Sequence, residues 1–225
     1  MRCSVNGLAA VLTLDEALVV IVGGGQVATR RARRLMTTGA RLMVIAPEAT
    51  EELAAAEEAG ELRWQRRGYR HGDLDGAALV VVATDDPRVN RRVVKAAGLA
   101  GIWSNVADDA DAGQVQFPAV ARRGQIRLAV DTDGAGPAVS GALRRHLEAT
   151  LSPGWERAAS LAAWLRPLLQ QRWPQQARRD FWCRFADELP AATEAPQKDI
   201  TTWLEGLAAA VDQELPPLDG MPLQD

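Results

Sequence analysis

Three consecutive glycines follow an apolar stretch near the start of the chain, and their spacing indicates a specific chemistry. Gly23, Gly25 and Ala28 have the G-x-G-x-x-A spacing of a strand-turn-helix that binds a dinucleotide. Gly23 allows a tight turn, Gly25 lets the backbone approach a pyrophosphate, and Ala28 lets the next helix pack closely on the strand. The phosphates would lie at the helix N-terminus, where N–H groups and the helix dipole favour negative charge. A tight turn without a ligand is the alternative interpretation.

Alternating strand-like and helix-like segments surround this glycine loop. The pattern predicts strands at about 18–22, 41–45, 61–65, 77–83 and 101–105, and helices at about 26–38, 50–59 and 84–97. This order is typical of a parallel sheet covered by helices. The stretch 77–83 is continuously apolar, as expected of a buried central strand. Gly39 is expected to cap the end of the first helix.

The pattern changes after residue 111. Residues 114–120 and 125–130 predict a hairpin, and a glycine-rich turn at 133–137 precedes a helix that ends near residue 151. From residue 153 the pattern is helical, and the acidic tail contains one more helix at about 200–211. Prolines at 167, 174 and 190 are expected to break the helices. We therefore expect an α/β domain at 1–112, a small α+β region at 113–151 and a helical region at 152–225.

Composition and charge argue against several classes of protein. The 225 residues are 47% apolar with a net charge of −3, which is ordinary for a globular protein and gives no reason to expect nucleic acid as a partner. We expect no membrane span and no secretory signal, because no apolar stretch has the required length or flanks. The isolated Cys3, Cys183, His71 and His146 form no zinc motif, so no metal ligands are assigned. The cytoplasm is the expected location.

Several separated motifs, in order along the chain, resemble one family. Besides the glycine loop they include Ala83-Thr-Asp-Asp-Pro, Val89-Asn-Arg, Asn105-Val-Ala-Asp-Asp, Phe117-Pro-Ala, Arg123-Gly, Ala129-Val-Asp-Thr-Asp and Leu143-Arg. Over about residues 18–151 the chain resembles precorrin-2 dehydrogenase, the NAD-dependent module that also forms the N-terminal part of siroheme synthase. The resemblance implies a Rossmann NAD-binding domain at 1–112, a dimerisation region at 113–151 and a C-terminal helical domain at 152–225.

The resemblance also implies an activity. The expected reaction is NAD-dependent oxidation of precorrin-2 to sirohydrochlorin by a homodimer, and some members of the family also insert Fe²⁺ to give siroheme. The family's catalytic aspartate maps onto Asp108. Loss of a hydride leaves the tetrapyrrole as a cation, and a nearby carboxylate can stabilise that charge and then accept a proton. A helix or turn cap is the alternative role of Asp108, while Asp109 and Asp111 are expected to be solvated turn residues.

The resemblance assigns the cofactor contacts to the ends of three strands. They are Gly23, Gly24, Gly25, Gln26, Val27, Pro47, Glu48, Thr84 and Asp85. An NAD site usually has an acid at the tip of its second strand, but here Ala46 occupies the tip and Glu48 is the nearest acid. Arg30 or Arg31 would instead favour the phosphate of NADP, although the family precedent favours NAD. The alternative role of Thr84 is to cap the next helix.

A tetrapyrrole with many carboxylates requires a site rich in arginine. Residues 121–185 contain 11 Arg against 5 acids, although the whole chain is slightly acidic. The expected substrate contacts are Asn105, Thr132, Arg144 and Arg145. Asp131 and Asp133 depart from the family pattern, because carboxylates there would repel the substrate's acids and attract Fe²⁺.

Two other functions stay open at this point. The altered turn at 133–136 suggests a chelatase that has lost its dehydrogenase activity. A non-catalytic Rossmann regulator that senses NAD(H) would need the glycine loop but neither Asp108 nor the arginine-rich second half. In each case the expected ligands are small molecules, with no membrane as a partner.

Overall fold

The computed structural model describes residues 7–107, 109, 111–133, 136–194 and 200–221. The chain divides after Phe117 into two compact units, which are described separately below. Within the described ranges, no helix combines the length and the apolar character that crossing a membrane requires.

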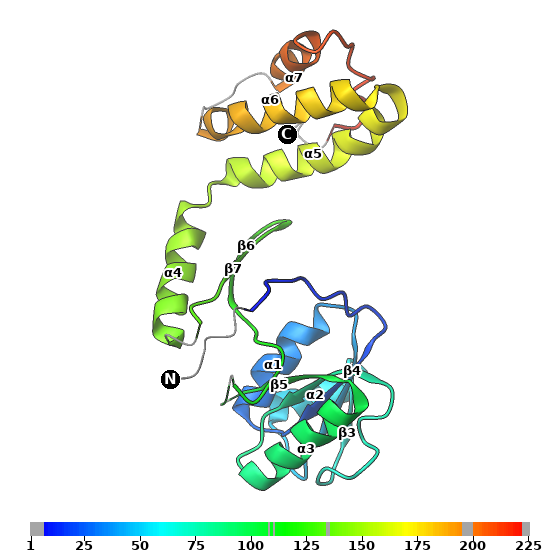
Figure 1. Ribbon diagram of the computed structural model, residues 1–225, viewed down its shortest axis with the longest axis vertical. Coiled ribbons are helices and arrows are strands. Elements are labelled where there is room, and N and C mark those ends of the chain that lie inside the picture. The colour runs from blue at the N-terminus through cyan, green and yellow to red at the C-terminus, as the bar shows by residue number, and fades with distance from the viewer. Residues whose placement is uncertain (1–6, 108, 110, 134–135, 195–199, 222–225) are drawn as a thin grey trace. The chain divides into compact units, whose positions relative to one another are not determined.

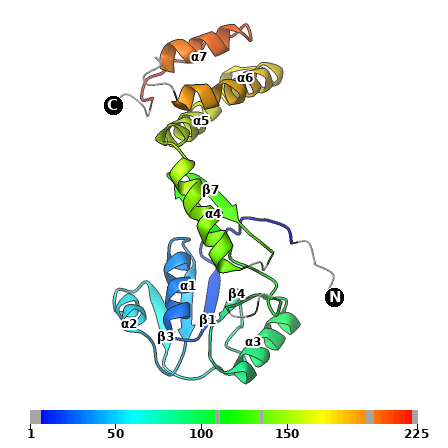
Figure 2. The same cartoon turned by 90° about the vertical axis from the view of Figure 1, so that its left-hand side faces the viewer.

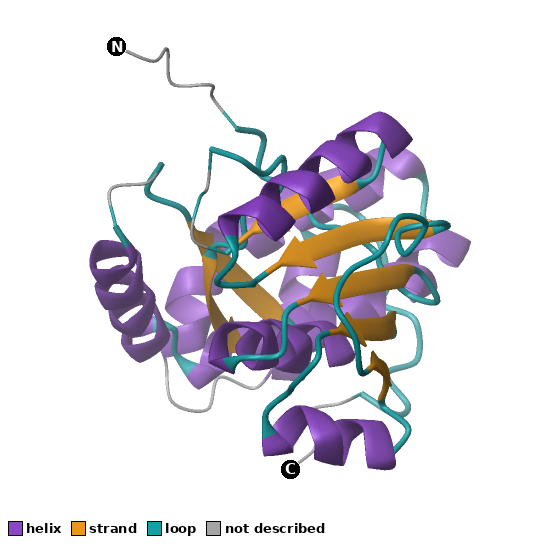
Figure 3. Cartoon of the chain, turned by 90° about the horizontal axis from the view of Figure 1, so that it is seen from below, coloured by secondary structure: helices purple, strands orange, loops and turns teal. Residues whose placement is uncertain are grey.

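The first unit is a parallel five-stranded sheet covered by helices on both faces (Figures 1 and 3). The strands lie in the order β3-β2-β1-β4-β5. Its elements are β1 (Leu18–Val22), α1 (Gln26–Met36), β2 (Arg41–Ile45), α2 (Glu51–Glu58), β3 (Leu62–Gln65), β4 (Ala77–Val82), α3 (Pro87–Ala100) and β5 (Trp103–Val106). This topology confirms the predicted Rossmann-type domain.

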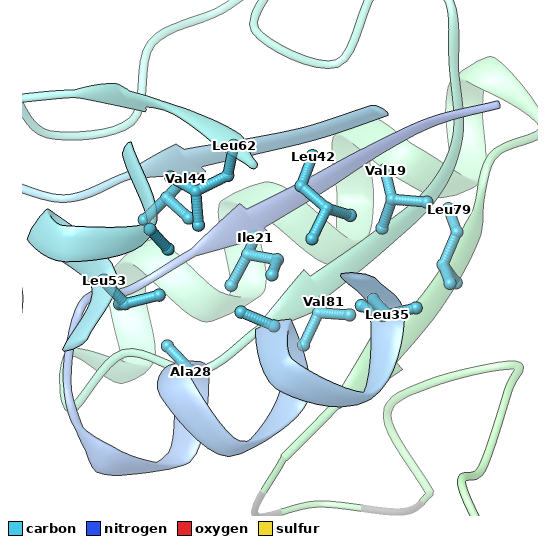
Figure 4. Packing of buried hydrophobic residues seen from close by; sticks show 12 residues of the cluster. Val19, Ile21, Ala28, Leu35, Leu42, Val44, Leu53, Leu62, Leu79 and Val81 are labelled. Atoms are coloured by element: carbon cyan, nitrogen blue, oxygen red, sulfur yellow. The ribbon is translucent and has the colours of Figure 1, made fainter. Parts of the chain in front are cut away.

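The sheet has a core on each face, because successive side chains of a strand point to opposite sides. Val19 and Ile21 of β1 pack with Ala28 of α1 and Leu53 of α2, as Figure 4 shows. Val20 and Val22 pack on the other face, in the cluster that contains Val93 of α3. Both faces of β1 are therefore sealed, which fixes the position of the glycine loop that follows it.

The ends of two predicted elements differ from the structure. Helix α1 ends at Met36 with Thr37 as its C-cap, so Gly39 lies in the following turn, where its φ is +75°. Helix α3 extends to Ala100, and Gly101 ends it in the left-handed conformation, with φ +68°. Strand β5 consequently starts two residues later than the sequence predicted.

The segment 113–117 does not form the start of a hairpin, which corrects the prediction from the sequence. The backbone N–H groups of Gln114 and Val115 donate to Ser104 O at 2.8 and 2.9 Å, so the chain returns along β5. The reason is apolar packing, because Val115 and Phe117 lie against the core under α1. We call residues 113–117 the return segment.

The described part of the second unit contains a small hairpin and four helices. They are β6 (Ala119–Arg123), β7 (Ile126–Val130), α4 (Pro137–Thr150), α5 (Pro153–Arg172), α6 (Gln175–Glu194) and α7 (Ile200–Ala209). Helix α4 packs on the antiparallel β6–β7 pair (Figure 2). Helices α5, α6 and α7 share a separate apolar core. The further boundary expected at residue 151 stays a prediction.

Two of the three prolines expected to break helices do not break them. Pro167 lies inside α5 and Pro190 inside α6, whereas Pro174 does separate the two helices. An internal proline costs about 3 kcal/mol, and burial of one leucine returns about 1.5–3 kcal/mol. Three leucines of α5, Leu161, Leu165 and Leu169, are at most 1% exposed. Their burial outweighs the lost hydrogen bond.

Candidate cofactor and substrate site

The first two glycines of the loop after β1 are required by the fold itself. Gly23 has φ +127°, and a Cβ added there would lie 2.1 Å from the carbonyl oxygen of Ala83. A Cβ on Gly24 would lie 2.0 Å from the carbonyl oxygen of Glu48. The ends of β1, β2 and β4 therefore meet at a distance that only glycine permits.

Gly25 differs from its two neighbours. Its φ is −80°, which any residue can adopt, and an added Cβ would meet no protein atom within 4 Å. It is the N-cap of α1, and no side chain caps that helix end. The protein itself gives no reason for a glycine here, whereas a phosphate bound to the N–H groups of α1 does. The loop therefore fits a dinucleotide.

A cavity of about 860 Å³ opens in front of this helix end. Its walls come from the loops after β1, β2, β3 and β4. It is lined by all the residues predicted to bind the cofactor: Gly23, Gly24, Gly25, Gln26, Val27, Pro47, Glu48, Thr84 and Asp85. The volume lies in the range usual for a cofactor site. The individual contacts of these residues stay predictions.

The charges around the cavity favour NAD over NADP. Glu48, Asp85 and Asp86 line it, and none of the described lining residues is a lysine or arginine. Arg30 is exposed outside the cavity, and the guanidinium of Arg31 lies over the ring of Phe117. Glu48 is thus the acid available to the ribose hydroxyls at the end of β2.

Thr84 does not cap α3. Asp86 does so, because its Oδ1 accepts from the backbone N–H of Arg88 at 2.7 Å. The hydroxyl of Thr84 lies 2.6 Å from Asn90 Oδ1, and the Asn90 amide donates back to the Thr84 carbonyl at 2.9 Å. These two bonds hold the loop after β4 at the edge of the cavity.

Tyr69 lines the cavity and was missed by the sequence analysis. Its loop is held by Arg67, which donates two hydrogen bonds of 2.8 Å to the Asp73 carboxylate, and by the Arg70 N–H, which donates to the same group at 2.7 Å. The hydrogen bonds from Arg67 hold the pKa of Asp73 below its usual value, and burial raises the pKa of Tyr69. The available signal was an aromatic residue four positions after the end of a parallel strand, in the sequence Arg67-Gly-Tyr-Arg.

Comparison with known proteins identifies the family. A family model described as "Putative NAD(P)-binding" matches residues 10–119. Siroheme synthase from Chromobacterium violaceum is 41% identical over 172 residues, which are 76% of this chain and 37% of that protein. Siroheme synthase from Methylococcus capsulatus is 37% identical over 210 residues, which are 91% of this chain and 44% of that protein. The chain therefore spans less than half the length of these relatives.

A solved structure is similar over most of the chain. SirC, precorrin-2 dehydrogenase, superposes with a TM-score of 0.68 and 25% identity, over 92% of this chain and 99% of that one. The chain belongs to the precorrin-2 dehydrogenase and siroheme synthase family. Its first unit is the NAD-binding domain of that family.

The residues that the family resemblance assigned to the substrate lie on different elements. Asp108 lies outside the described residues. Asn105 belongs to the first unit, where it is 3% exposed, and its amide donates to the Val115 carbonyl at 2.8 Å. The Asn105 Oδ1 is buried, and no described residue forms a hydrogen bond with it. Asn105 therefore holds the return segment in place, and its Oδ1 can still accept a hydrogen bond from a ligand.

The other three predicted substrate residues belong to the second unit. Thr132 follows β7, and its backbone N–H donates to Asp131 Oδ1 at 2.7 Å. The same oxygen accepts from the Asp133 N–H at 3.2 Å, so Asp131 serves as a turn residue. On α4, Arg144 is paired with Glu148, and Arg145 is exposed.

Proposed function

We propose that this chain oxidises precorrin-2 to sirohydrochlorin with NAD⁺ as the hydride acceptor. The observation that carries the proposal is the extent of the structural match, which covers 99% of SirC, precorrin-2 dehydrogenase, and both units of this chain. A regulator that only senses NAD(H) would need the first unit alone. The chain instead has counterparts of nearly the whole dehydrogenase.

The loops after three strands bind different parts of the dinucleotide. The uncapped N-terminus of α1 binds the pyrophosphate, and Glu48 accepts hydrogen bonds from ribose hydroxyls. Thr84 and Asp85 then border the nicotinamide, which supplies the hydride acceptor when the cofactor is bound. Tyr69 and Val89 of α3 line the same cavity.

Asp108 is the proposed catalytic acid–base group. The residue before it, Ala107, donates its N–H to the Val82 carbonyl at 2.9 Å, which attaches this point of the chain to the carboxyl end of β4. Ligands of open parallel sheets bind at that edge. The Asp108 carboxylate would accept the proton that the substrate loses, and bound NAD⁺ would supply the hydride acceptor, so two electrons and both hydrogens are accounted for.

The remaining substrate contacts are proposed on chemical grounds. Arg144 and Arg145 would bind carboxylates, with Arg144 exchanging Glu148 for a substrate acid, and Thr132 and Asn105 would supply polar contacts. The relatives named siroheme synthase support Fe²⁺ insertion as a second activity, with Fe²⁺ as a substrate. The exposed free thiol of Cys183 fits a reducing compartment, so we also propose a cytoplasmic location.

We propose a homodimer formed through the β6–β7 hairpin and α4, corresponding to the expected region 113–151. Helix α4 has no buried residue, and its Val139 and Leu143 are 54% and 44% exposed. A two-stranded sheet is only marginally stable by itself, and both of its edges have unpaired backbone groups. A second copy of the chain would cover these surfaces.

The test compares Asp108→Asn with the unchanged chain in a reaction of precorrin-2 with NAD⁺. We expect the variant to bind NAD⁺ normally and to lose at least about 100-fold in the rate of NADH formation. The matched control is Asp109→Asn, because the Asp109 carboxylate accepts the N–H groups of Asp111 and Ala112 and so serves the turn. Full NADH formation by Asp108→Asn would refute the catalytic role. Metal insertion without any NADH formation by the unchanged chain would favour a chelatase.

A further inference from the structure

Arg31 is a half-buried cation without an anionic partner among the described residues. It lies on the second turn of α1, and its Nε is buried with no hydrogen-bond partner. Its guanidinium carbon lies 5.0 Å from the ring centroid of Phe117 in the return segment. Arg33, two residues later, is instead paired with Glu52 of α2 at 2.6 Å. The two arginines therefore lie on different sides of the helix, and only one is neutralised.

The surroundings of Arg31 disfavour an uncompensated charge. Burial, together with the positive charges of Arg34 and Arg30, lowers the pKa of Arg31. An arginine nevertheless stays protonated in proteins, so the positive charge persists at neutral pH. Buried charges and buried N–H donors are paired in nearly all native structures. A ring face satisfies part of this requirement but accepts no normal hydrogen bond from the buried Nε.

The position of Arg31 indicates where its partner would come from. Val27, one turn earlier on the same side of α1, lines the dinucleotide cavity, but Arg31 does not. Long helical side chains lean toward the helix N-terminus, which here is the end at the cavity. The guanidinium therefore lies beside the cofactor site and outside it.

A second unpaired polar atom borders the same segment. Asn105 lies in one row across the sheet with Val81 and Ile21, whose side chains pack beneath α1. Its amide binds the Val115 carbonyl, while its Oδ1 has no partner. A buried donor, Arg31 Nε, and a buried acceptor, Asn105 Oδ1, thus have no partner among the described residues, and both belong to side chains that contact the return segment. Asn105 belongs to β5, the strand that leads to Asp108.

We propose that Arg31 binds a carboxylate of the tetrapyrrole substrate. Helix α1 would then position both reactants, with its N-terminus on the cofactor phosphates and its second turn on the substrate. The inference rests on the proposed function and adds a substrate-binding residue to it. A 2′-phosphate of NADP fits less well, because it would lie near Glu48 at the end of β2, and β1 and β4 separate β2 from β5.

The test measures equilibrium binding of sirohydrochlorin, NAD⁺ and NADP⁺ to the full chain and to three variants. Arg31→Met keeps the apolar stem on Phe117 without the charge, and Arg31→Lys keeps the charge without the planar fork. Arg30→Met is the matched control, because Arg30 is exposed on the same helix. We expect Arg31→Met to raise the Kd for sirohydrochlorin about 10- to 100-fold, the usual effect of a lost charged hydrogen bond.

We also expect two further results, one from Arg31→Lys and one from the NAD⁺ affinity and Tm of Arg31→Met. Arg31→Lys should recover part of the affinity, and Arg31→Met should leave the NAD⁺ affinity within about twofold and the Tm unchanged or higher. An unchanged sirohydrochlorin Kd in Arg31→Met would overturn the inference. So would a loss of NADP⁺ binding alone, or a lowered Tm with equal losses for all ligands, which would indicate a structural role. Failure of the proposed function would be visible separately, as no sirohydrochlorin binding and no NADH formation by the unchanged chain.

Discussion

Strand β1 and helix α4 are both rich in apolar side chains, but those of β1 are buried and those of α4 are not. In β1 the residues from Val19 to Val22 are at most 1% exposed, sealed by helices on both faces of the sheet. In α4 no residue is buried, although the helix packs on the β6–β7 hairpin. Strand β1 thus needs no further cover, while α4 keeps an apolar surface that a partner can cover. Cofactor binding should depend on the first unit alone, and assembly should depend on the second.

The largest expected effect is in the glycine loop. Gly23→Ala would place a methyl group 2.1 Å from the Ala83 carbonyl at a φ of +127°, so β1 and β4 could not keep their spacing. We expect a loss of about 3 kcal/mol or more in the free energy of unfolding of the first unit. Chemical denaturation followed by circular dichroism measures it. A variant as stable as the unchanged chain would contradict the packing described for this loop.

The next effect concerns the second unit. Replacing both Val139 and Leu143 with Asp should raise the dimer dissociation constant at least about 100-fold, because charges would replace apolar side chains in the proposed interface. Light scattering during gel filtration measures the mass. Leu99→Asp is the control, since Leu99 is 82% exposed on the first unit. If the double variant stays dimeric, α4 is not the interface. If it loses NAD⁺ binding as well, the two units are not independent.

Gly25→Ala separates binding from folding within one loop. An added methyl meets no protein atom but would point into the space assigned to the cofactor phosphates. We expect NAD⁺ binding to weaken about 10- to 100-fold by isothermal titration, with the Tm within about a degree of the unchanged chain. A large fall in Tm would show that this glycine serves the fold, as Gly23 does.

A smaller effect is expected where α2 meets the loop. Thr50 caps α2, its backbone N–H donates to the Gly24 carbonyl at 3.0 Å, and its hydroxyl lies 2.8 Å from that of Thr29. Thr50→Ala should cost about 1 kcal/mol of stability, while Thr50→Ser should cost a few tenths. Urea denaturation midpoints compare the two. Equal losses would mean that the methyl group of Thr50, and not its hydroxyl, is what matters.

The smallest expected effect is a pH dependence of stability that comes from Asp73 in the loop that carries Tyr69. The pKa of Asp73 is lower in the folded chain, chiefly because Arg67 donates hydrogen bonds to it. Its stabilising contribution is therefore complete above its unfolded pKa of 3.8 and is lost as pH falls through the lower folded value. Asp73→Asn should lower the Tm at pH 7 and narrow the difference between pH 7 and pH 3. If the difference in Tm between pH 7 and pH 3 is the same in the variant, the Arg67–Asp73 pair does not contribute to stability.

The same contrast explains what the sequence could predict. The strands β1, β2 and β4 and the residues Gly23–Val27 have local patterns that determine their structure, so they were located almost to the residue. The return segment depends on contacts with distant parts of the chain, which no local pattern contains. The loop of Tyr69 is held locally by Arg67 and Asp73, but its place on the cavity wall depends on where the distant strands β1, β2 and β4 end. Pro167 was misjudged because the burial of Leu161, Leu165 and Leu169 outweighs a local preference. The family resemblance, and not periodicity, supplied Asp108 and the substrate.

The most direct test of the account is the stoichiometry of the complete reaction. The purified full chain is incubated without oxygen with precorrin-2 and NAD⁺, and the NADH and sirohydrochlorin spectra are recorded together. The account predicts equal amounts of the two products, and a rate that falls strongly in Gly25→Ala at limiting NAD⁺. Sirohydrochlorin formation without NADH, or no consumption of precorrin-2 by a chain that binds NAD⁺, would contradict it.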